Sequence, residues 1–287
     1  MTSRPQSLAL ALFALGAQAL PPTANAQGDA PAVTADAGLP YADRADLVLA
    51  SPVIVDATIR SAARIRGAEA AGVGPGQTRF YIEADVLALL RSPGAMPQRI
   101  GYLLDVAPDT AGRLPKLRKM RVLVFARGVA GSNGQLQLVS PAGQQPWSPA
   151  LDASIRAITA EALAREAPPE VTGVGNAFHV AGSLPGEGET QIFLQTADNR
   201  PVSLSVLRRP GEQPRWAVVL SEIVDDAAAP PRRDTLLWYR LACALPRDLP
   251  ARSTSQMEGN DADTAREDYR FVLSRLGACV RALPPIG

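Results

Sequence analysis

The chain has 287 residues, of which 46% are hydrophobic and 20% are charged, and its formal net charge is +1. This composition allows about two domains with buried cores and excludes a wholly disordered chain. A nearly neutral chain is also not expected to be a dedicated nucleic-acid-binding protein, because such proteins concentrate positive charge on one surface.

Residues 1–26 are predicted to be a signal peptide. Arg4 and the amino terminus supply the positive start, and residues 8–20 form an apolar stretch that is too short to span a bilayer. Ala24 and Ala26 give the A-x-A pattern of a cleavage site at its end. No later segment is apolar enough to cross a membrane. We therefore expect a soluble protein that is periplasmic or secreted and has no membrane span in the mature chain.

Residues 27–40 are small, polar and proline-containing, which predicts a flexible arm. The pattern turns to β at residue 41, and a first domain is predicted over residues 41–166. Hydrophobic alternation predicts four strands, and the turn at residues 132–134 (Ser-Asn-Gly) leads into a fifth. The four strands are PVIVDATIRSAARI, TRFYIEADVLALL, RIGYLLDVA and MRVLVFARG. An amphipathic helix after Ser148, the expected N-cap residue, completes the domain.

Five strands, of which the first two are long, favour a small closed OB-like β-barrel over a flat sheet. The runs ADLVLASPVIVDATI, TRFYIEADVLALLRS, RIGYLLDVA and KMRVLVFARG resemble the OB-fold of netrin modules and tissue inhibitors of metalloproteinases. The resemblance covers residues 41–166 and implies a fold. Inhibitors of that family chelate the protease zinc through an amino-terminal cysteine. This region has no cysteine, so the resemblance implies no inhibitory residue here.

A second, smaller α+β domain is predicted over residues 170–287. The prolines at residues 168 and 169 end the preceding helix and mark the boundary. Three β runs then predict a three-stranded antiparallel meander, and two C-terminal helices follow. The β runs are TQIFLQT, PVSLSVLRR and RWAVVLSEIV. The fold class is therefore expected to be mainly β with some α.

Cys243 and Cys279 are the two cysteines of the chain. An even number of cysteines in an exported protein favours one disulfide bond over two free buried thiols. The apolar stripe of the last helix, which includes Tyr269, Val272 and Leu276, is expected to continue to Cys279. The disulfide bond would then join two neighbouring helices.

His179 is the one histidine of the chain and its candidate catalytic residue. It is of the right type for a general base or metal ligand, with Glu187 and Glu189 as partners across a glycine-rich turn. The alternative is a half-buried histidine near the start of a strand. A hydrolase would have to use Ser183 or Ser221 as its nucleophile, and neither lies in a G-x-S-x-G or S-x-x-K motif. No metal site and no cofactor are expected, because a single histidine offers too few ligands.

A basic cluster precedes the fourth predicted strand and is the candidate binding site of the chain. It consists of Lys116, Arg118, Lys119 and Arg121. Such a cluster suits an anionic polymer or a lipid head group, and the alternative is a solvated loop. No aromatic residues are interleaved with these cations, so base stacking on nucleic acid is not expected.

These observations predict an exported, non-catalytic protein that acts by binding or interaction in the cell envelope. The partner is an unknown envelope protein or an anionic ligand. The alternative is an exported hydrolase that uses His179. An accessory factor of a larger envelope complex would in addition present a contiguous exposed apolar patch on one domain face.

Overall fold

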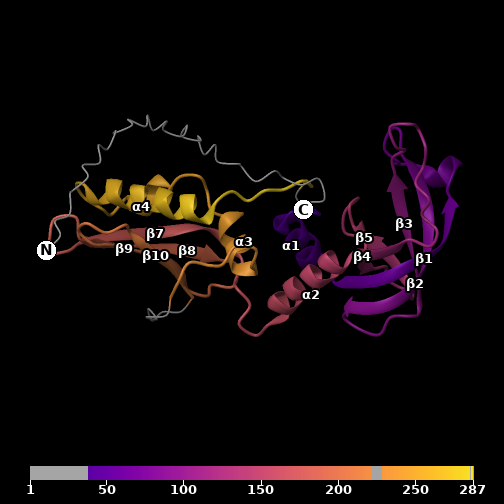
Figure 1. Cartoon of the computed structure of the whole chain (residues 1–287), viewed down its shortest axis with the longest axis horizontal. Coiled ribbons are helices and arrows are strands. Elements are labelled where there is room, and N and C mark those ends of the chain that lie inside the picture. Colours follow the sequence, from indigo (N-terminus) through magenta and orange to yellow (C-terminus); the bar gives the residue numbers. More distant parts are fainter. Residues whose placement is uncertain (1–37, 221–227, 285, 287) are drawn as a thin grey trace, which may run out of the picture. The chain divides into compact units, whose positions relative to one another are not determined.

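The structure is a computed structural model that describes residues 38–220, 228–284 and 286 of the chain (Figure 1). The expectations for residues 1–26 and for most of the arm at 27–40 lie outside these residues. Two β-sheets and four α-helices are present in the described part. The predicted class, mainly β with some α, is therefore confirmed.

The described chain begins with helix α1 (Tyr41–Ala50), where the sequence pattern predicted β structure. That prediction is wrong for these ten residues. Tyr41, Ala45 and Val48 are spaced by four and three residues and are all buried, which is the spacing of one helical face. Asp43 lies in the first turn, where a negative charge is favourable. The alternation with a period of two starts only after the helix.

Five strands close into a barrel, as predicted. They are β1 (Val53–Arg64), β2 (Thr78–Arg91), β3 (Arg99–Val106), β4 (Arg121–Gly128) and β5 (Gln135–Leu138). Their order is β1-β2-β3-β5-β4, and β1 also pairs with β4, which closes the barrel. The β3–β5 pairing is parallel and the others are antiparallel. Register shifts along the β1–β2 pair allow these long strands to bend around the barrel.

The barrel has its own hydrophobic core. Its buried side chains come from alternate positions of the strands, together with Leu117 from the β3–β4 connection. They include Val55, Ile59, Ile82, Ile100, Tyr102, Val122 and Val124. The Tyr102 hydroxyl donates a hydrogen bond of 2.6 Å to Gln144 Oε1. Gln144 begins a short strand, β6 (Gln144–Pro146), which pairs with β4 and was not expected from the sequence.

Helix α2 (Pro149–Leu163) follows the barrel strands and begins as predicted. Ser148 is the N-cap residue, and its hydroxyl accepts a hydrogen bond of 3.2 Å from the Leu151 amide. Ile155 and Ile158 are buried on the expected apolar face. The N-cap and the helical periodicity were both visible in the sequence, because each depends on residues within one or two turns.

The second sheet has four antiparallel strands, whereas three were predicted. They are β7 (Val171–Ala181), β8 (Gly188–Thr196), β9 (Val202–Arg208) and β10 (Arg215–Val219), in the order β10-β9-β8-β7. The additional strand is β7, which contains His179. Its pairing with β8 is shifted after Val171 and again after Val174. These irregularities interrupt the two-residue alternation, and for that reason the sequence pattern did not reveal the strand.

The two predicted C-terminal helices are α3 (Leu236–Ala242) and α4 (Asp261–Leu276), and two short 3₁₀ helices, η1 (Gly67–Ala70) and η2 (Ala251–Thr254), complete the elements. Helix α4 covers the second sheet over β7 and β8 (Figure 1). The predicted stripe of Tyr269, Val272 and Leu276 is buried. The stripe does not continue to Cys279, because the helix ends at Leu276. The next residue, Gly277, is the C-cap and has a φ of 73°, which is unfavourable for residues with a side chain.

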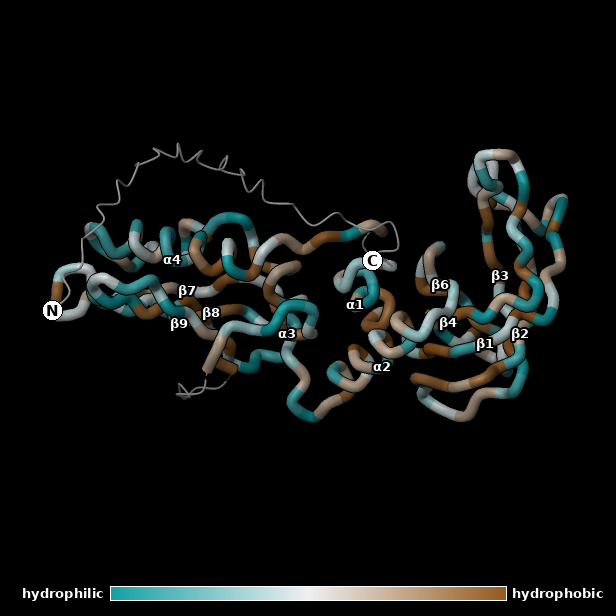
Figure 2. Tube along the Cα trace, in the orientation of Figure 1, coloured by the Kyte–Doolittle hydropathy of each residue, from teal (hydrophilic) through white to brown (hydrophobic). Residues whose placement is uncertain are grey.

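A second hydrophobic cluster lies outside the barrel interior. It contains residues of α1 and α2, the inner face of the second sheet, α3 and α4, together with Ile54, Leu123 and Phe125 of the barrel strands. Figure 2 shows hydrophobic residues in the strands of both sheets and hydrophilic residues along much of α4. The domain boundary at residues 167–169 stays a prediction, since this cluster includes residues from both sides of it.

Candidate functional site

The two faces of the second sheet carry different side chains. In the β7–β8 ladder Phe178 lies opposite Gln191, His179 opposite Thr190, and Val180 opposite Glu189. Because side chains of a strand alternate between faces, His179 and Thr190 lie on the inner face, which α4 covers. Phe178 and Val180 lie on the outer face. The candidate histidine and the exposed residues beside it therefore point in opposite directions.

His179 is half-buried and belongs to a chain of hydrogen bonds that runs into the protein. Its Nδ1 lies 2.8 Å from Thr190 Oγ1. The Thr190 hydroxyl donates a hydrogen bond of 2.5 Å to Asp268 Oδ2, on α4. Thr190 has one hydroxyl proton and gives it to Asp268, so His179 Nδ1 must be the donor toward Thr190. The sheet thus holds the His179 ring in one orientation.

Asp268 forms the inner end of this chain and has no exposed surface. Its Oδ1 accepts a hydrogen bond of 2.7 Å from Arg208 Nε, and Arg208 Nη2 forms an ion pair with the same oxygen at 2.6 Å. The hydrogen bond to Asp268, together with the negative charges of Asp268 and Glu267, raises the pKa of Arg208 above its usual value. A buried carboxylate is thereby matched by one guanidinium and one hydroxyl. This arrangement attaches α4 to β8 and β9.

The two glutamates predicted as partners of His179 are hydrogen-bonded to other groups. Glu189 accepts a hydrogen bond from Ser205, and Glu187 accepts hydrogen bonds from Ser183 and from the Leu184 amide. The prediction is wrong because Glu189 is adjacent to Thr190 in β8 and so lies on the opposite face. The actual partner, Thr190, lies directly across the strand pair from His179.

A hydrolase would need a nucleophile beside His179. Ser183, one of the two predicted candidates, bonds to Glu187 instead, and Ser221 lies outside the described residues. In the described part of the chain no serine is hydrogen-bonded to His179. Thr190 is completely buried and its proton goes to Asp268. The geometry therefore supports a structural role for His179 better than the hydrolase alternative.

The outer face of the second sheet carries exposed hydrophobic side chains. Phe178 is 44% exposed, Val180 68% and Phe193 38%. The rings of Phe178 and Phe193 meet edge to face, with their centroids 6.0 Å apart. A shallow cavity of about 470 Å³ adjoins them. Its lining includes Phe178, Val180, Gln191 and Leu207, together with the carboxylates Glu187 and Glu189. We call this set of residues, with Phe193, the outer face.

The four residues of the predicted basic cluster have different surroundings in the structure. Lys116, Arg118 and Lys119 are exposed. Arg121 instead donates hydrogen bonds of 3.0 and 2.7 Å to the buried carboxylate of Asp56, and its guanidinium lies 3.6 Å from the centre of the Trp147 ring. Arg121 is the first residue of β4 and is held in the barrel wall. The other three predicted residues are exposed and form no salt bridge within the described part of the chain.

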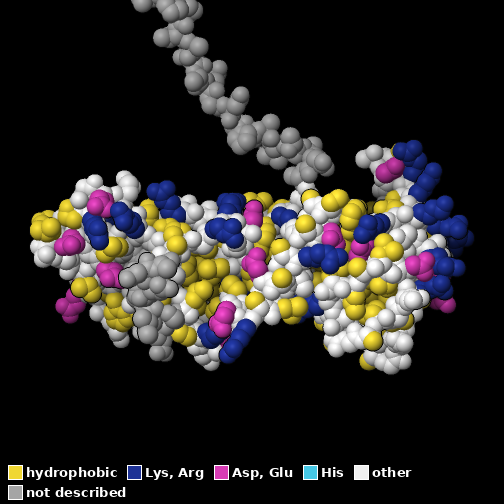
Figure 3. Space-filling model, turned by 60° about the horizontal axis from the view of Figure 1, so that its bottom comes forward, with side chains coloured by type: hydrophobic (Ala, Val, Ile, Leu, Met, Phe, Trp, Pro, Cys, Tyr) yellow, Lys and Arg dark blue, Asp and Glu magenta, His cyan; other side chains and the backbone are white. Residues whose placement is uncertain are grey.

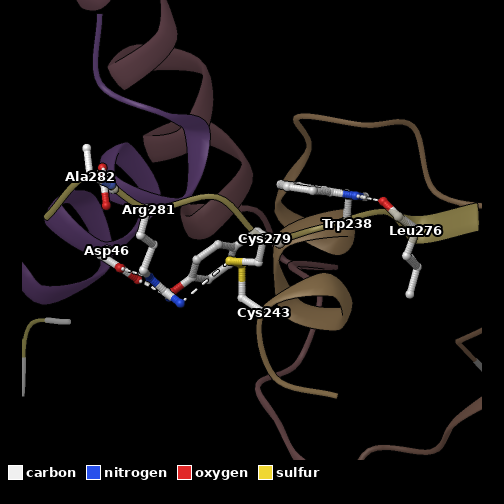
Figure 4. The surroundings of a disulfide bond; sticks show 9 residues. Asp46, Trp238, Cys243, Leu276, Cys279, Arg281 and Ala282 are labelled. Atoms are coloured by element: carbon white, nitrogen blue, oxygen red, sulfur yellow. Dashed lines mark hydrogen bonds and ion pairs between the residues drawn. A yellow bond between two sulfur atoms is a disulfide. The ribbon is translucent and has the colours of Figure 1, made fainter. Parts of the chain in front are cut away.

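Cys243 and Cys279 form a disulfide bond with a Cα–Cα distance of 5.1 Å (Figure 4). Cys243 is the C-cap residue of α3, and Cys279 lies in the segment after α4. The bond therefore joins the end of one helix to the C-terminal segment, rather than two packed helices. The Trp238 indole N–H donates a hydrogen bond of 2.8 Å to the Leu276 carbonyl and so connects α3 to α4.

The C-terminal segment is also bound to α1 (Figure 4). Arg281 donates hydrogen bonds of 2.8 and 3.1 Å to the two oxygens of Asp46, which also accepts a hydrogen bond from the Tyr239 hydroxyl. Asp43 Oδ2 accepts from the amides of Ala282 and Leu283 at 2.8 and 3.3 Å. The sequence did not indicate these contacts, because more than 190 residues separate each pair.

Tyr239 makes the stability of this contact depend on alkaline pH. Burial, together with the hydrogen bond to Asp46, raises the pKa of Tyr239 to about 12, compared with about 10 in an unfolded chain. Its contribution is therefore fully present below pH 10 and is lost as the pH rises from 10 to 12, since the unfolded chain releases the proton first. Burial also raises the pKa of Tyr41, Tyr102 and Tyr269, which adds to the same decline.

We expect Tyr239→Phe to lower the free energy of unfolding at pH 8 by about 1 kcal/mol, the value of one hydrogen bond. Between pH 10 and pH 12 the variant should lose less stability than the unchanged protein, because phenylalanine has no proton to release. Urea denaturation at a series of pH values measures both effects. Parallel stability curves for the two proteins across this range would show that Tyr239 does not contribute.

In the described part of the chain, no group of three or more histidine, cysteine, aspartate or glutamate side chains is placed to hold a metal ion. Likewise, none of the described helices combines the length and the apolar character that crossing a membrane requires. Comparison of the chain with protein-family models and with curated proteins finds no match.

Proposed function

We propose that this chain is an exported, non-catalytic interaction protein of the cell envelope, and that it binds a partner protein through the outer face of the second sheet. The observation that carries the proposal is the exposure of Phe178, Val180 and Phe193 together on one open sheet. A group of large apolar side chains on one surface is typical of an interaction site, whereas single exposed ones are ordinary.

The outer face supports a particular kind of partner. Phe178 and Phe193 hold each other edge to face, which gives rigid aromatic anchors of the sort that dominate binding energies. Glu187 and Glu189 line the cavity beside them. A partner that inserts an apolar side chain and places a lysine or arginine next to it would match both the shape and the charge of this surface.

The cell envelope is proposed on two grounds. The predicted signal peptide at residues 1–26 supports export to the periplasm or secretion. The Cys243–Cys279 disulfide bond supports an oxidising compartment. For the barrel we propose the netrin-module type of OB-fold, which the five-stranded topology supports. Only the fold is proposed from that likeness, since the barrel has no cysteine for inhibitor chemistry.

The double variant Phe178→Ser/Phe193→Ser tests the proposal by co-purification from an envelope extract of cells that naturally produce the protein. The unchanged protein is expected to retain a discrete partner at stoichiometric amounts, and the double variant to lose it. Leu163→Ser is the matched control, because Leu163 is 60% exposed on α2, away from the outer face. It should retain the partner.

Thermal unfolding of the purified variants first establishes that both are folded. The same retained proteins with the double variant and with the control would overturn the proposal. So would retention of nothing but a second copy of this chain, which would make the outer face a self-association surface. An activity that is lost in His179→Ala but not in Phe178→Ser/Phe193→Ser would favour the hydrolase alternative instead.

A further inference from the structure

The connection between β3 and β4 displays cations from a fixed backbone. Leu117 is 5% exposed and packs in the barrel core. Its neighbours Lys116 and Arg118 are exposed on either side of it. Because the buried leucine anchors the loop, these two side chains extend from defined positions, as they would not from a loop that is free in solvent.

The backbone of Lys119 is also fixed in position, by hydrogen bonds to β1. Its amide donates a hydrogen bond of 2.7 Å to the Ile59 carbonyl, and the Ile59 amide donates one of 2.9 Å to the Met120 carbonyl. These bonds continue the β1–β4 pairing beyond Arg121 and bring Lys119 beside the strand position of Arg60. Lys119 also has a φ of 70°, a conformation that is unfavourable for lysine and persists only where the surroundings impose it.

Only some of the cations on the barrel strands and on the β3–β4 connection are paired with acidic side chains. Arg79 pairs with Asp105, Arg113 with Asp109 and Arg121 with Asp56. Arg64, Lys116, Arg118 and Lys119 have no acidic side chain within salt-bridge distance among the residues that the structure describes, and Arg60 lies 3.8 Å from Asp85, which also pairs with Arg99. We call this set the basic surface, and it comprises Arg60, Arg64, Lys116, Arg118 and Lys119. Figure 3 shows several lysine or arginine side chains, in dark blue, at the barrel end of the view, and others along the rest of that face.

We propose that the basic surface binds the anionic head groups of a lipid membrane. Several exposed cations, of which only Arg60 has an acidic neighbour at 3.8 Å among the described residues, match many phosphates in a plane better than one small anion, which would require an enclosing pocket. The set contains no aromatic side chain on which a nucleic-acid base could stack. The basic surface lies on the barrel and the outer face on the second sheet, so either proposal can fail without the other.

The expected strength follows from the number of cations. Each lysine or arginine near an anionic membrane strengthens binding roughly fivefold. Loss of three cations should therefore weaken binding roughly 100-fold. Because the attraction is electrostatic and the side chains are exposed, it should also decline steeply once the Debye length falls below about 10 Å.

The test is co-sedimentation of the chain without residues 1–26 with lipid vesicles. Phosphatidylcholine vesicles that contain about 30% phosphatidylglycerol, a lipid that supplies the negative charge, are compared with pure phosphatidylcholine. The triple variant Lys116→Gln/Arg118→Gln/Lys119→Asn removes three cations, and asparagine at position 119 tolerates the positive φ. The matched control is Arg247→Gln/Arg252→Gln/Arg270→Gln, which removes three exposed cations elsewhere.

We expect binding to the anionic vesicles only, a roughly 100-fold loss in the triple variant and less than about a threefold change in the control. Binding of the unchanged chain should disappear between about 0.05 and 0.5 M salt, a result that does not depend on how well any variant folds. Equal binding to both kinds of vesicle, equal losses in the two triple variants, or insensitivity to salt would overturn the proposal. Binding to a single-stranded oligonucleotide without binding to vesicles would overturn it as well.

Discussion

Replacing Asp268 with alanine is expected to lower the free energy of unfolding by about 3 to 5 kcal/mol. Asp268 is completely buried and is the acceptor for both Arg208 and Thr190. Without it, a largely buried guanidinium loses its main counter-charge and the Thr190 hydroxyl loses its acceptor. Leaving a buried charge uncompensated is among the most destabilising single changes, because the group is then removed from water with no compensation.

The matched control for this prediction is Glu267→Ala. Glu267 lies next to Asp268 in α4 and also contacts Arg208, at 3.2 Å, but its side chain is 66% exposed. Water screens such a pair, so its loss should cost less than about 1 kcal/mol. Urea denaturation measures both variants. Similar losses for Asp268→Ala and Glu267→Ala would show that burial of the Asp268 carboxylate does not determine the stability of this contact.

Removal of the disulfide bond is expected to have an effect of similar size. Cys243 and Cys279 are 36 residues apart in the sequence. In the chain-entropy model, a closed loop of this length stabilises the folded state by roughly 3 to 4 kcal/mol. We therefore expect Cys243→Ala/Cys279→Ala to lower the free energy of unfolding by that amount. The C-terminal segment should nevertheless remain attached, since Asp46 and Asp43 bind it independently of the disulfide bond.

Urea denaturation with and without a reducing agent checks this prediction. Reduction should destabilise the unchanged protein by about as much as the double substitution does, and it should leave the double variant unaffected. Adding Arg281→Ala to the double cysteine variant should lower the free energy of unfolding by a further ~1 to 2 kcal/mol, because Arg281 makes two charged hydrogen bonds to Asp46. If reduction left the urea midpoint of the unchanged protein the same, the disulfide bond would not stabilise the fold, which would contradict this prediction.

Local signals in the sequence were sufficient for much of the fold. The barrel strands were visible because their side chains alternate, and helix α2 was visible because Ser148 and Pro149 mark its start. Helix α1 also had a signal, the buried spacing of Tyr41, Ala45 and Val48, but the β pattern that follows at Val53 obscured it. Strand β7 was missed for a physical reason, since its irregular pairing with β8 breaks the alternation.

The contacts of the candidate sites were less accessible to sequence reasoning. Thr190 and Asp268 are 78 residues apart, and no local pattern connects them. The same holds for Arg121, which belongs to a basic run in the sequence but is neutralised by Asp56, 65 residues away. The register of β7 against β8 determines which face of the sheet Phe178 occupies. Register depends on pairing between distant residues and so requires the structure.

The central claim, that a partner protein binds the outer face, is tested most directly by site-specific photo-crosslinking in intact cells that produce the protein. A photoreactive amino acid replaces Val180 on the outer face or Leu163 on α2; both positions are exposed. We predict one discrete crosslinked product from position 180, none from position 163, and loss of the product when Phe193→Ser is added. The same products from both positions, or a product from position 180 that persists with Phe193→Ser, would contradict the claim.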